Sequence, residues 1–236
     1  MSKKNFDIYI NLSPKKLSIA AFKKFEDHNT FFKEYSCLTD LNKDQLNFEN
    51  TEKTIEKNIF EIEKETDEFL NDIYLMVETP QSSSINLSLM KHNEGRKIEK
   101  KNVQYLVQDA RQQILRSYNS KKIIHIIITN YVIDNVAYDY LPLDVKCNKF
   151  SIDIKFICFP KDLIKKLEEL FNSQQIFINK IICSHYAKSF SKNEPYMNVC
   201  ESGLKLIKGT NKLEVTIVPR KLEKKGFFER LFHFFK

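Results

Sequence analysis

The sequence predicts an α/β protein assembled from two units. Short apolar-rich segments of strand type open the chain, and a segment with helical spacing follows from about residue 50. Residues 72–77 then form a nearly continuous apolar run ahead of Pro80. Such a run is typical of a strand buried on both faces of a parallel sheet. Strands, a helix and a buried strand in this order indicate an α/β half-domain.

The first elements are expected to form a three-stranded meander. Residues 6–12 and 16–22 are apolar-rich strands joined by a turn at 13–15, and residues 30–35 could add the third strand.

A helix is predicted from Asn50 to about Leu70, because apolar residues recur there at near-helical spacing among Glu and Lys. Thr51 and Thr54 are available near its start as capping residues. The recurring apolar residues are Ile55, Ile59, Phe60, Ile62 and Phe69.

The second unit is predicted to be a strand, a helix and two more strands. Apolar and polar residues alternate over 85–90, as in a strand with one solvent-exposed face. Residues 121–129 are the most β-prone run of the chain. After a turn near Asp134, residues 151–159 alternate again. The helix spans 101–118, with these residues facing inward: Val103, Leu106, Val107, Ala110, Ile114 and Leu115.

The chain then returns to the first unit. Pro160 stands at the start of a further helix, and residues 176–183 are a strand. Residues 196–207 could be helical, and residues 213–218 are predicted to be the last strand. The apolar side of the helix that follows Pro160 consists of Leu163, Ile164, Leu167, Leu170 and Phe171.

The last eleven residues, 226–236, have the pattern of an interfacial membrane anchor. On a helix their apolar side chains gather in one arc of about 160°. A charged tether, 219–225, precedes them. The alternative is a terminal helix packed on its own domain, but a helix this short is marginal alone in water. The residues expected to bind the membrane are Phe227, Phe228, Leu231, Phe232, Phe234, Phe235, Lys224, Lys225 and Arg230.

The composition limits the number of domains, the kinds of partner and the compartment that we expect. The 236 residues are 42% hydrophobic, which suits one or two globular domains, and the net charge of +7 fits either nucleic acid or an anionic membrane. No apolar run of membrane-spanning length and no signal-type segment is present, so we expect a cytoplasmic protein. The five cysteines are scattered, and we expect them to be reduced.

No catalytic or metal-binding constellation is evident. The five histidines lack metal-ligand spacing. Cys183 and His185 lie close in sequence, but a packed cysteine and a structurally bonded histidine are the favoured interpretation. Lys121 and Lys122 are followed by aliphatic residues, not interleaved with aromatics, which disfavours nucleic acid as a partner. We therefore expect no enzyme, no cofactor and no metal.

The order of these elements resembles the bacterial cell-division protein FtsA, an actin-like ATPase with a strand-helix-strand-strand insertion in its first domain. Residues 10–17, Ile-Asn-Leu-Ser-Pro-Lys-Lys-Leu, fall where that family has its first phosphate-binding hairpin. Residues 85–159 look like the insertion, 160–190 like the return helix, strand and Ala-containing turn, and Gly203-Leu204 is similar to a late Gly-Leu segment. Residues 226–236 match the membrane-targeting helix of the family in position and type.

The resemblance implies half of an actin-like, ribonuclease H-like fold with an inserted subdomain and a C-terminal amphipathic helix. It divides the chain into a first actin-like part (1–83), the insertion (84–159), the return part (160–218), the tether (219–225) and the membrane helix (226–236). By analogy with FtsA, the insertion would contact neighbouring FtsA molecules and other division proteins, with self-association open. Its outer strand is expected to be residues 85–90 or 151–159, and an exposed strand edge can pair with a strand of another chain.

Departures from the family pattern alter the expected function. Asn11 stands where the family has a metal-facing Asp, Ser13 replaces its first Gly, and Pro14 has no amide hydrogen for a phosphate. Together with Lys16 these residues make a degenerate phosphate hairpin. Between Phe190 and Pro195 there is also no room for the second actin-like domain, which leaves binding of FtsZ doubtful.

The resemblance therefore implies a non-hydrolysing, membrane-tethered adaptor of the divisome, peripheral on the inner face of the cytoplasmic membrane. Alternatives are a pilus-assembly adaptor of actin-like architecture and a basic nucleic-acid-binding module. A nucleic-acid module would bind in a steeply salt-dependent way and would not need residues 226–236.

Overall fold

A computed structural model describes residues 5–36, 46–192, 194 and 196–216. The predicted tether 219–225 and membrane helix 226–236 lie outside the described residues. Within the described part, no helix is long and apolar enough to cross a membrane.

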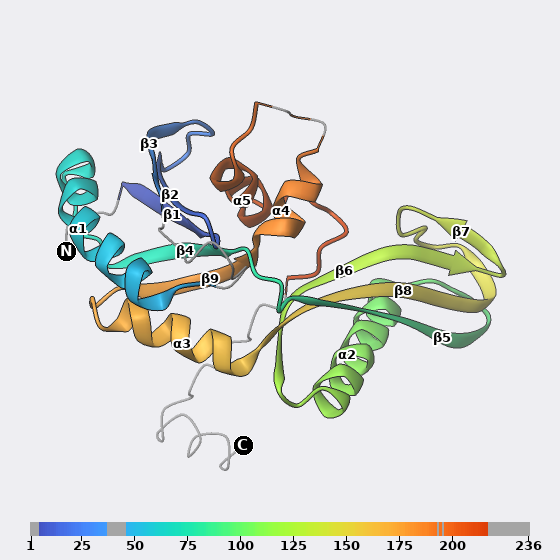
Figure 1. The fold of residues 1–236 in the computed structure, drawn as a ribbon. Helices are drawn as coiled ribbons and strands as arrows, with labels where there is room; N and C mark the ends of the chain where they lie inside the picture. The colour runs from blue at the N-terminus through green and yellow to red at the C-terminus, as the bar shows by residue number, and fades with distance from the viewer. Residues whose placement is uncertain (1–4, 37–45, 193, 195, 217–236) are drawn as a thin grey trace, which may run out of the picture.

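The first sheet has five strands in the order β3-β2-β1-β4-β9 (Figure 1). β1 pairs antiparallel with β2 and parallel with β4, and β4 pairs parallel with β9. The predicted meander and the buried parallel strand are thus confirmed. This order and these directions are those of one ribonuclease H-like domain, half of the actin-like fold. The strands are β1 (Phe6–Leu12), β2 (Lys16–Lys23), β3 (Asn29–Ser36), β4 (Asp72–Val77) and β9 (Phe177–Cys183).

Helices cover both faces of this sheet. α1 (Phe48–Thr66) and α3 (Lys161–Asn172) share one core with the first face. The short α4 (Ser184–Phe190) and α5 (Val199–Ile207) pack on the other face (Figure 1). All five apolar residues predicted for the inner side of α3 are buried.

The start of α1 differs from the prediction. Asn47 is the N-cap, and its side chain accepts a hydrogen bond from the Asn50 amide at 3.0 Å. The hydroxyls of Thr51 and Thr54 instead donate back to carbonyls one turn earlier, as hydroxyls inside a helix do. At the other end, the left-handed Asp67 stops the helix before Leu70.

Two aromatic residues predicted within the apolar pattern of that helix are exposed. Phe60 lies on the outer side of α1 with 75% of its surface accessible, and Phe69, beyond the helix, has 82%.

The second sheet has the order β5-β8-β6-β7 with antiparallel pairing throughout. α2 (Lys100–Ser117) covers one face and shares a separate core with it. The predicted strand-helix-strand-strand unit is present, with an additional short strand after a turn at Asp134 and Asn135, which both have positive φ. The strands are β5 (Ser83–Lys97), β6 (Lys121–Ile133), β7 (Val136–Tyr138) and β8 (Lys146–Pro160). Leu115, predicted to face inward, is exposed because it lies off the buried stripe of α2.

The predicted last strand, 213–218, is replaced by an isolated bridge between Glu214 and Ile127 as far as the chain is described. The Ile128 amide donates to the Leu213 carbonyl at 2.9 Å, and the Val215 amide donates to the Ile126 carbonyl at 2.8 Å. The segment thus lies along β6 with strand-like contacts over three residues.

Candidate functional site

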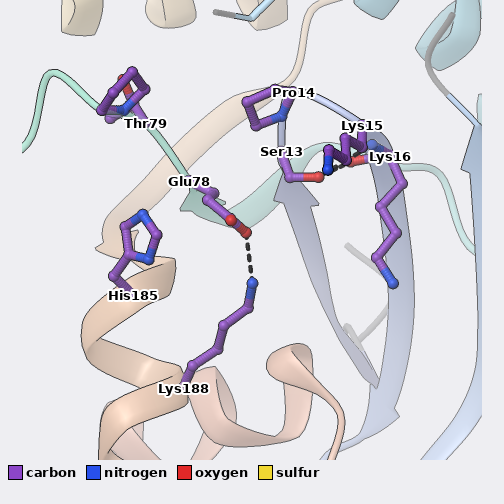
Figure 2. A pocket seen from close by; sticks show the side chains of 9 residues that line it. Ser13, Pro14, Lys15, Lys16, Glu78, Thr79, His185 and Lys188 are labelled. Atoms are coloured by element: carbon purple, nitrogen blue, oxygen red, sulfur yellow. Dashed lines mark hydrogen bonds and ion pairs between the residues drawn. The ribbon is translucent and has the colours of Figure 1, made fainter. Parts of the chain in front are cut away.

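The carboxyl ends of β1, β4 and β9 lead to a cavity of about 480 Å³ (Figure 2). In open sheets of this kind, ligands bind beyond the carboxyl ends of parallel strands. Three lysines, one glutamate and one histidine give it a basic character. The lining residues are Ser13, Pro14, Lys15, Lys16, Glu78, Thr79, Pro80, His185 and Lys188.

The β1–β2 hairpin at this cavity is hydrogen-bonded to itself. The Ser13 amide donates to the Lys16 carbonyl at 3.0 Å, and the Ser13 hydroxyl donates to the same carbonyl at 2.8 Å. The Lys16 amide donates to Ser13 Oγ at 3.1 Å. Pro14, between them, has no amide hydrogen. Two amides that a phosphate loop would present are therefore already used inside the turn.

The predicted hairpin residues separate into two groups. Ser13, Pro14 and Lys16 line the cavity. Asn11 does not, because its side chain is buried, with 1% exposure, and its Oδ1 accepts a hydrogen bond from the Ser184 hydroxyl at 2.7 Å. Asn11 thereby ties β1 to the first residue of α4 instead of facing a bound cation.

The Lys16 ammonium group is paired with a carboxylate of β3. Its Nζ lies 2.7 Å from Glu34 Oε1 on β3. This hydrogen bond holds the pKa of the Glu34 carboxyl below its usual value, although partial burial acts in the opposite direction.

The opposite wall of the cavity carries an ion pair and an exposed histidine. Lys188 and Glu78 form the ion pair that Figure 2 draws as a dashed line, and Lys188 Nζ lies 2.5 Å from Glu78 Oε2. His185 is exposed and lines the cavity, so its expected role as a structurally bonded histidine is wrong. Its position follows from α4, which begins at Ser184 and turns the next side chain outward.

A second polar cluster, which was not predicted from the sequence, lies where the two sheets meet. His125 is buried on β6, and its Nδ1 lies 2.7 Å from Glu214 Oε1. The Cys183 amide on β9 donates to His125 Nε2 at 2.9 Å. The Tyr186 hydroxyl donates to Glu214 Oε2 at 3.0 Å and accepts from the Asn211 side chain at 2.6 Å.

These contacts define the tautomer of His125. Nε2 must carry a lone pair because it accepts from the Cys183 amide, so the proton sits on Nδ1 and is donated to Glu214. Burial lowers the pKa of His125 below its ordinary value, and the Glu214 contact only partly offsets this effect. For Glu214, burial acts to raise the pKa, but the hydrogen bond from His125 and the charge of Lys180 outweigh it and hold the pKa low. A neutral histidine and an ionised glutamate therefore join the insertion, β9 and the segment near residue 214.

The described cysteines are packed groups. Cys147, Cys158, Cys183 and Cys200 are buried and free, and burial raises the pKa of each thiol. A thiol with a raised pKa is a poor nucleophile. Cys183 therefore agrees with the packed role expected for it. Among the described residues, no three His, Cys, Asp or Glu side chains gather as metal ligands would.

No family model and no curated protein matches the chain. Among solved structures, it is similar to a PilM-PilN type IV pilus biogenesis complex, with a TM-score of 0.46, 6% identity, and coverage of 78% of this chain and 49% of that one. It is also similar to the cytoplasmic domain of EpsL, an inner membrane component of the type II secretion system of Vibrio cholerae (TM-score 0.40, 6% identity, coverage 77% and 58%).

A third similar structure is a Bacteroides thetaiotaomicron protein with an actin-like ATPase fold and unknown function (TM-score 0.32, 15% identity, coverage 83% and 59%). The chain spans less than two thirds of the length of each of these structures. Its own strand order and inserted subdomain define the class, a protein with half of an actin-like fold.

Proposed function

We propose that this chain is a membrane-tethered adaptor of actin-like fold that neither binds nor hydrolyses ATP. The observation that carries the proposal is the self-bonded hairpin at the end of β1, where such a fold would hold phosphate. To bind the phosphates of ATP, a site needs convergent backbone amides and a metal cation. Here two amides are used within the turn, Pro14 has none, and Asn11 is bonded to Ser184.

The membrane tether is proposed from residues 219–236, which lie outside the described residues. Five phenylalanines and one leucine on one side of a short helix, behind a lysine-rich lead, are typical of a segment that lies in a membrane interface. The folded part would then be held at the inner face of the cytoplasmic membrane.

Two cellular contexts are proposed. The resemblance of the sequence to FtsA favours cell division, in which the inserted subdomain would contact other division proteins. The alternative is an adaptor in pilus assembly or a related secretion system. Two of the similar structures are a PilM-PilN complex of type IV pilus biogenesis and EpsL of a type II secretion system, and this alternative takes its cellular context from them.

Calorimetry with Mg-ATP tests the central proposal. A cooperative thermal transition would first establish that the full chain is folded. Titration with Mg-ATP should then release no heat of binding. The thermal midpoint of the chain should also be the same with and without millimolar Mg-ATP, since a ligand that binds the native state raises that midpoint. A micromolar dissociation constant would sink the proposal.

A fluorescent fusion separates the two contexts. Recruitment to the division site supports the cell-division role, whereas foci at the sites of pilus or secretion machinery support the alternative. A diffuse cytoplasmic signal contradicts both, because each requires the chain to reside at the membrane.

A further inference from the structure

The outer strand of the inserted subdomain, β5, has a long edge with which no strand of the described residues pairs. It is 15 residues long and stands at the end of its sheet (Figure 1). Of the strands in the described part of the chain, only β8 pairs with it. An edge of this kind exposes a row of backbone donors and acceptors that can pair with another strand.

The other sheet edges carry features that discourage such pairing. β3 has Lys33 and Glu34 near its middle and a register irregularity opposite Ala21 and Phe22. β9 carries Lys180 and a register shift, and β7 is three residues long. Charged residues, bulges and short length are the usual protections of an edge strand.

The first half of β5 lacks all three protections. Residues 83–90 read Ser-Ser-Ile-Asn-Leu-Ser-Leu-Met, with no charge and no proline. They pair with β8 in unbroken register, and the irregularity in this ladder lies only beyond His92. The edge therefore has neither a bulge nor a charged residue over residues 83–90.

Side chains along this edge alternate cleanly. Ile85 and Leu87 are half-buried against the core beneath α2, and Leu89 is buried in it. Asn86 and Ser88 point to the opposite, exposed face, where Met90 is 56% accessible. The two half-buried aliphatic residues leave apolar surface at the margin of the core.

We propose that this edge pairs antiparallel with β5 of a second copy of the chain, about a two-fold axis at Leu87. Leu87 then lies opposite its counterpart, Ile85 opposite Leu89, and Asn86 opposite Ser88. The residues paired in this register differ by zero, two or four positions, so both members of each pair lie on the same face of the sheet. Apolar residues therefore meet apolar ones on one face, and small polar residues meet on the other. The half-buried Ile85 and Leu87 gain apolar neighbours, and no like charges face each other across residues 84–90.

The same strand is thus complementary to itself, which favours a second copy over an unrelated strand. The pairing would make one continuous sheet from the insertions of both molecules. It deepens the proposed adaptor function, because two copies would carry two membrane tails. It depends neither on the absence of ATP binding nor on the tail itself.

Charge reversal at the edge gives a direct test. In the proposed register, N86K/S88K brings lysine opposite lysine, and N86E/S88E brings glutamate opposite glutamate. Mixing the two variants brings opposite charges together at both positions. Q104K/Q112K, on exposed positions of α2, is the matched control for added charge.

The measurement is light scattering of the full chain in a F228E/F232E background, which places two charges in the predicted apolar arc of residues 226–236. The unaltered edge and the Q104K/Q112K control should approach twice the 28.0 kDa single-chain mass as concentration rises. Each edge variant alone should stay at the single-chain mass, with association weakened at least tenfold, and the equimolar mixture should regain the doubled mass.

Three outcomes overturn the proposal: a single-chain mass for the unaltered edge at the highest soluble concentration, a doubled mass for both edge variants alone, and a mixture that stays monomeric. If the doubled mass is found only with the native tail, the tail rather than β5 drives association. None of these outcomes bears on the Mg-ATP experiment, so the two proposals fail separately.

Discussion

His125 is a buried titratable residue that connects three parts of the molecule. It contacts Glu214 near the end of the described chain and the Cys183 amide on β9. The sequence could not reveal this role, because a histidine within a β-prone aliphatic run shows neither its burial nor its partner 89 residues away. Only the packing of the insertion against β9 brings these groups together.

A first prediction concerns the pH dependence of stability. The pKa of His125 is lowered in the folded state, so below about pH 6.5 the unfolded chain takes up a proton that the folded chain resists. The free energy of unfolding should therefore fall as the pH decreases from about 7 to 5, by about 1 kcal/mol from this residue. Below about pH 4.5, the lowered pKa of Glu214 adds to the loss.

His125→Asn removes the titration while keeping an amide donor near the position of Nδ1. Denaturant unfolding should show the variant less stable at pH 7.5, with a smaller further loss between pH 7 and pH 5 than the native chain. Equal pH slopes for the two proteins would contradict the neutral, buried state of His125.

Most individual elements could be predicted from the sequence, because hydrophobic periodicity and turn residues are local signals. The parallel strand β4 and the buried side of α3 are examples. Strand order is not local. The alternation of residues 151–159 fits an edge strand as well as an inner one, and the hypothesis that it could be the outer strand of the insertion is wrong, because β8 lies between β5 and β6.

The same limit applies to the candidate site. The sequence predicted a hairpin unsuited to phosphate, and three of its four residues do line the cavity. It could not predict that the side chain of Asn11 turns inward to Ser184, 173 residues later, or that His185 turns outward. Local sequence indicates which residues occupy a turn, whereas the directions of their side chains depend on distant partners.

A second prediction uses the inner position of β8. Asp153 pairs with Ser88 of β5 and with Asn130 of β6, so proline there would disrupt the ladder at the centre of the sheet. We expect Asp153→Pro to lower the free energy of unfolding by about 3 kcal/mol.

Asp153→Ala is the control, because it removes only the side-chain hydrogen bonds to Ser88 and Asn130 and should cost about 1 kcal/mol. Urea unfolding of both variants measures the difference. Similar stabilities for the proline and alanine variants would show that the backbone hydrogen bonds at this position do not contribute to the free energy of unfolding.

At the scale of the whole molecule, the adaptor proposal combines a folded body, a neutral strand edge and a basic, apolar tail. Burying part of the apolar side of the tail would contribute about 1 kcal/mol for each of its six apolar residues. Ordering the helix costs about 1 kcal/mol per residue, and each lysine near an anionic surface returns about 1 kcal/mol. The net affinity of one tail should be weak and reversible, so two tails on one particle would dwell far longer than one.

The third prediction is that Phe228→Glu with Phe232→Glu releases the protein from membranes. Both substitutions place a charge in the middle of the predicted apolar arc without shortening the tether, so they test insertion rather than length. In flotation with anionic liposomes, the native chain should float and the double variant should stay free, while their thermal midpoints agree.

The matched control is F25E/F69E, which makes the same chemical change at two phenylalanines of the folded body that are 98% and 82% exposed. That control should float like the native chain. A tail variant that still floats and loses several degrees of thermal stability would mean that residues 226–236 belong to the folded core.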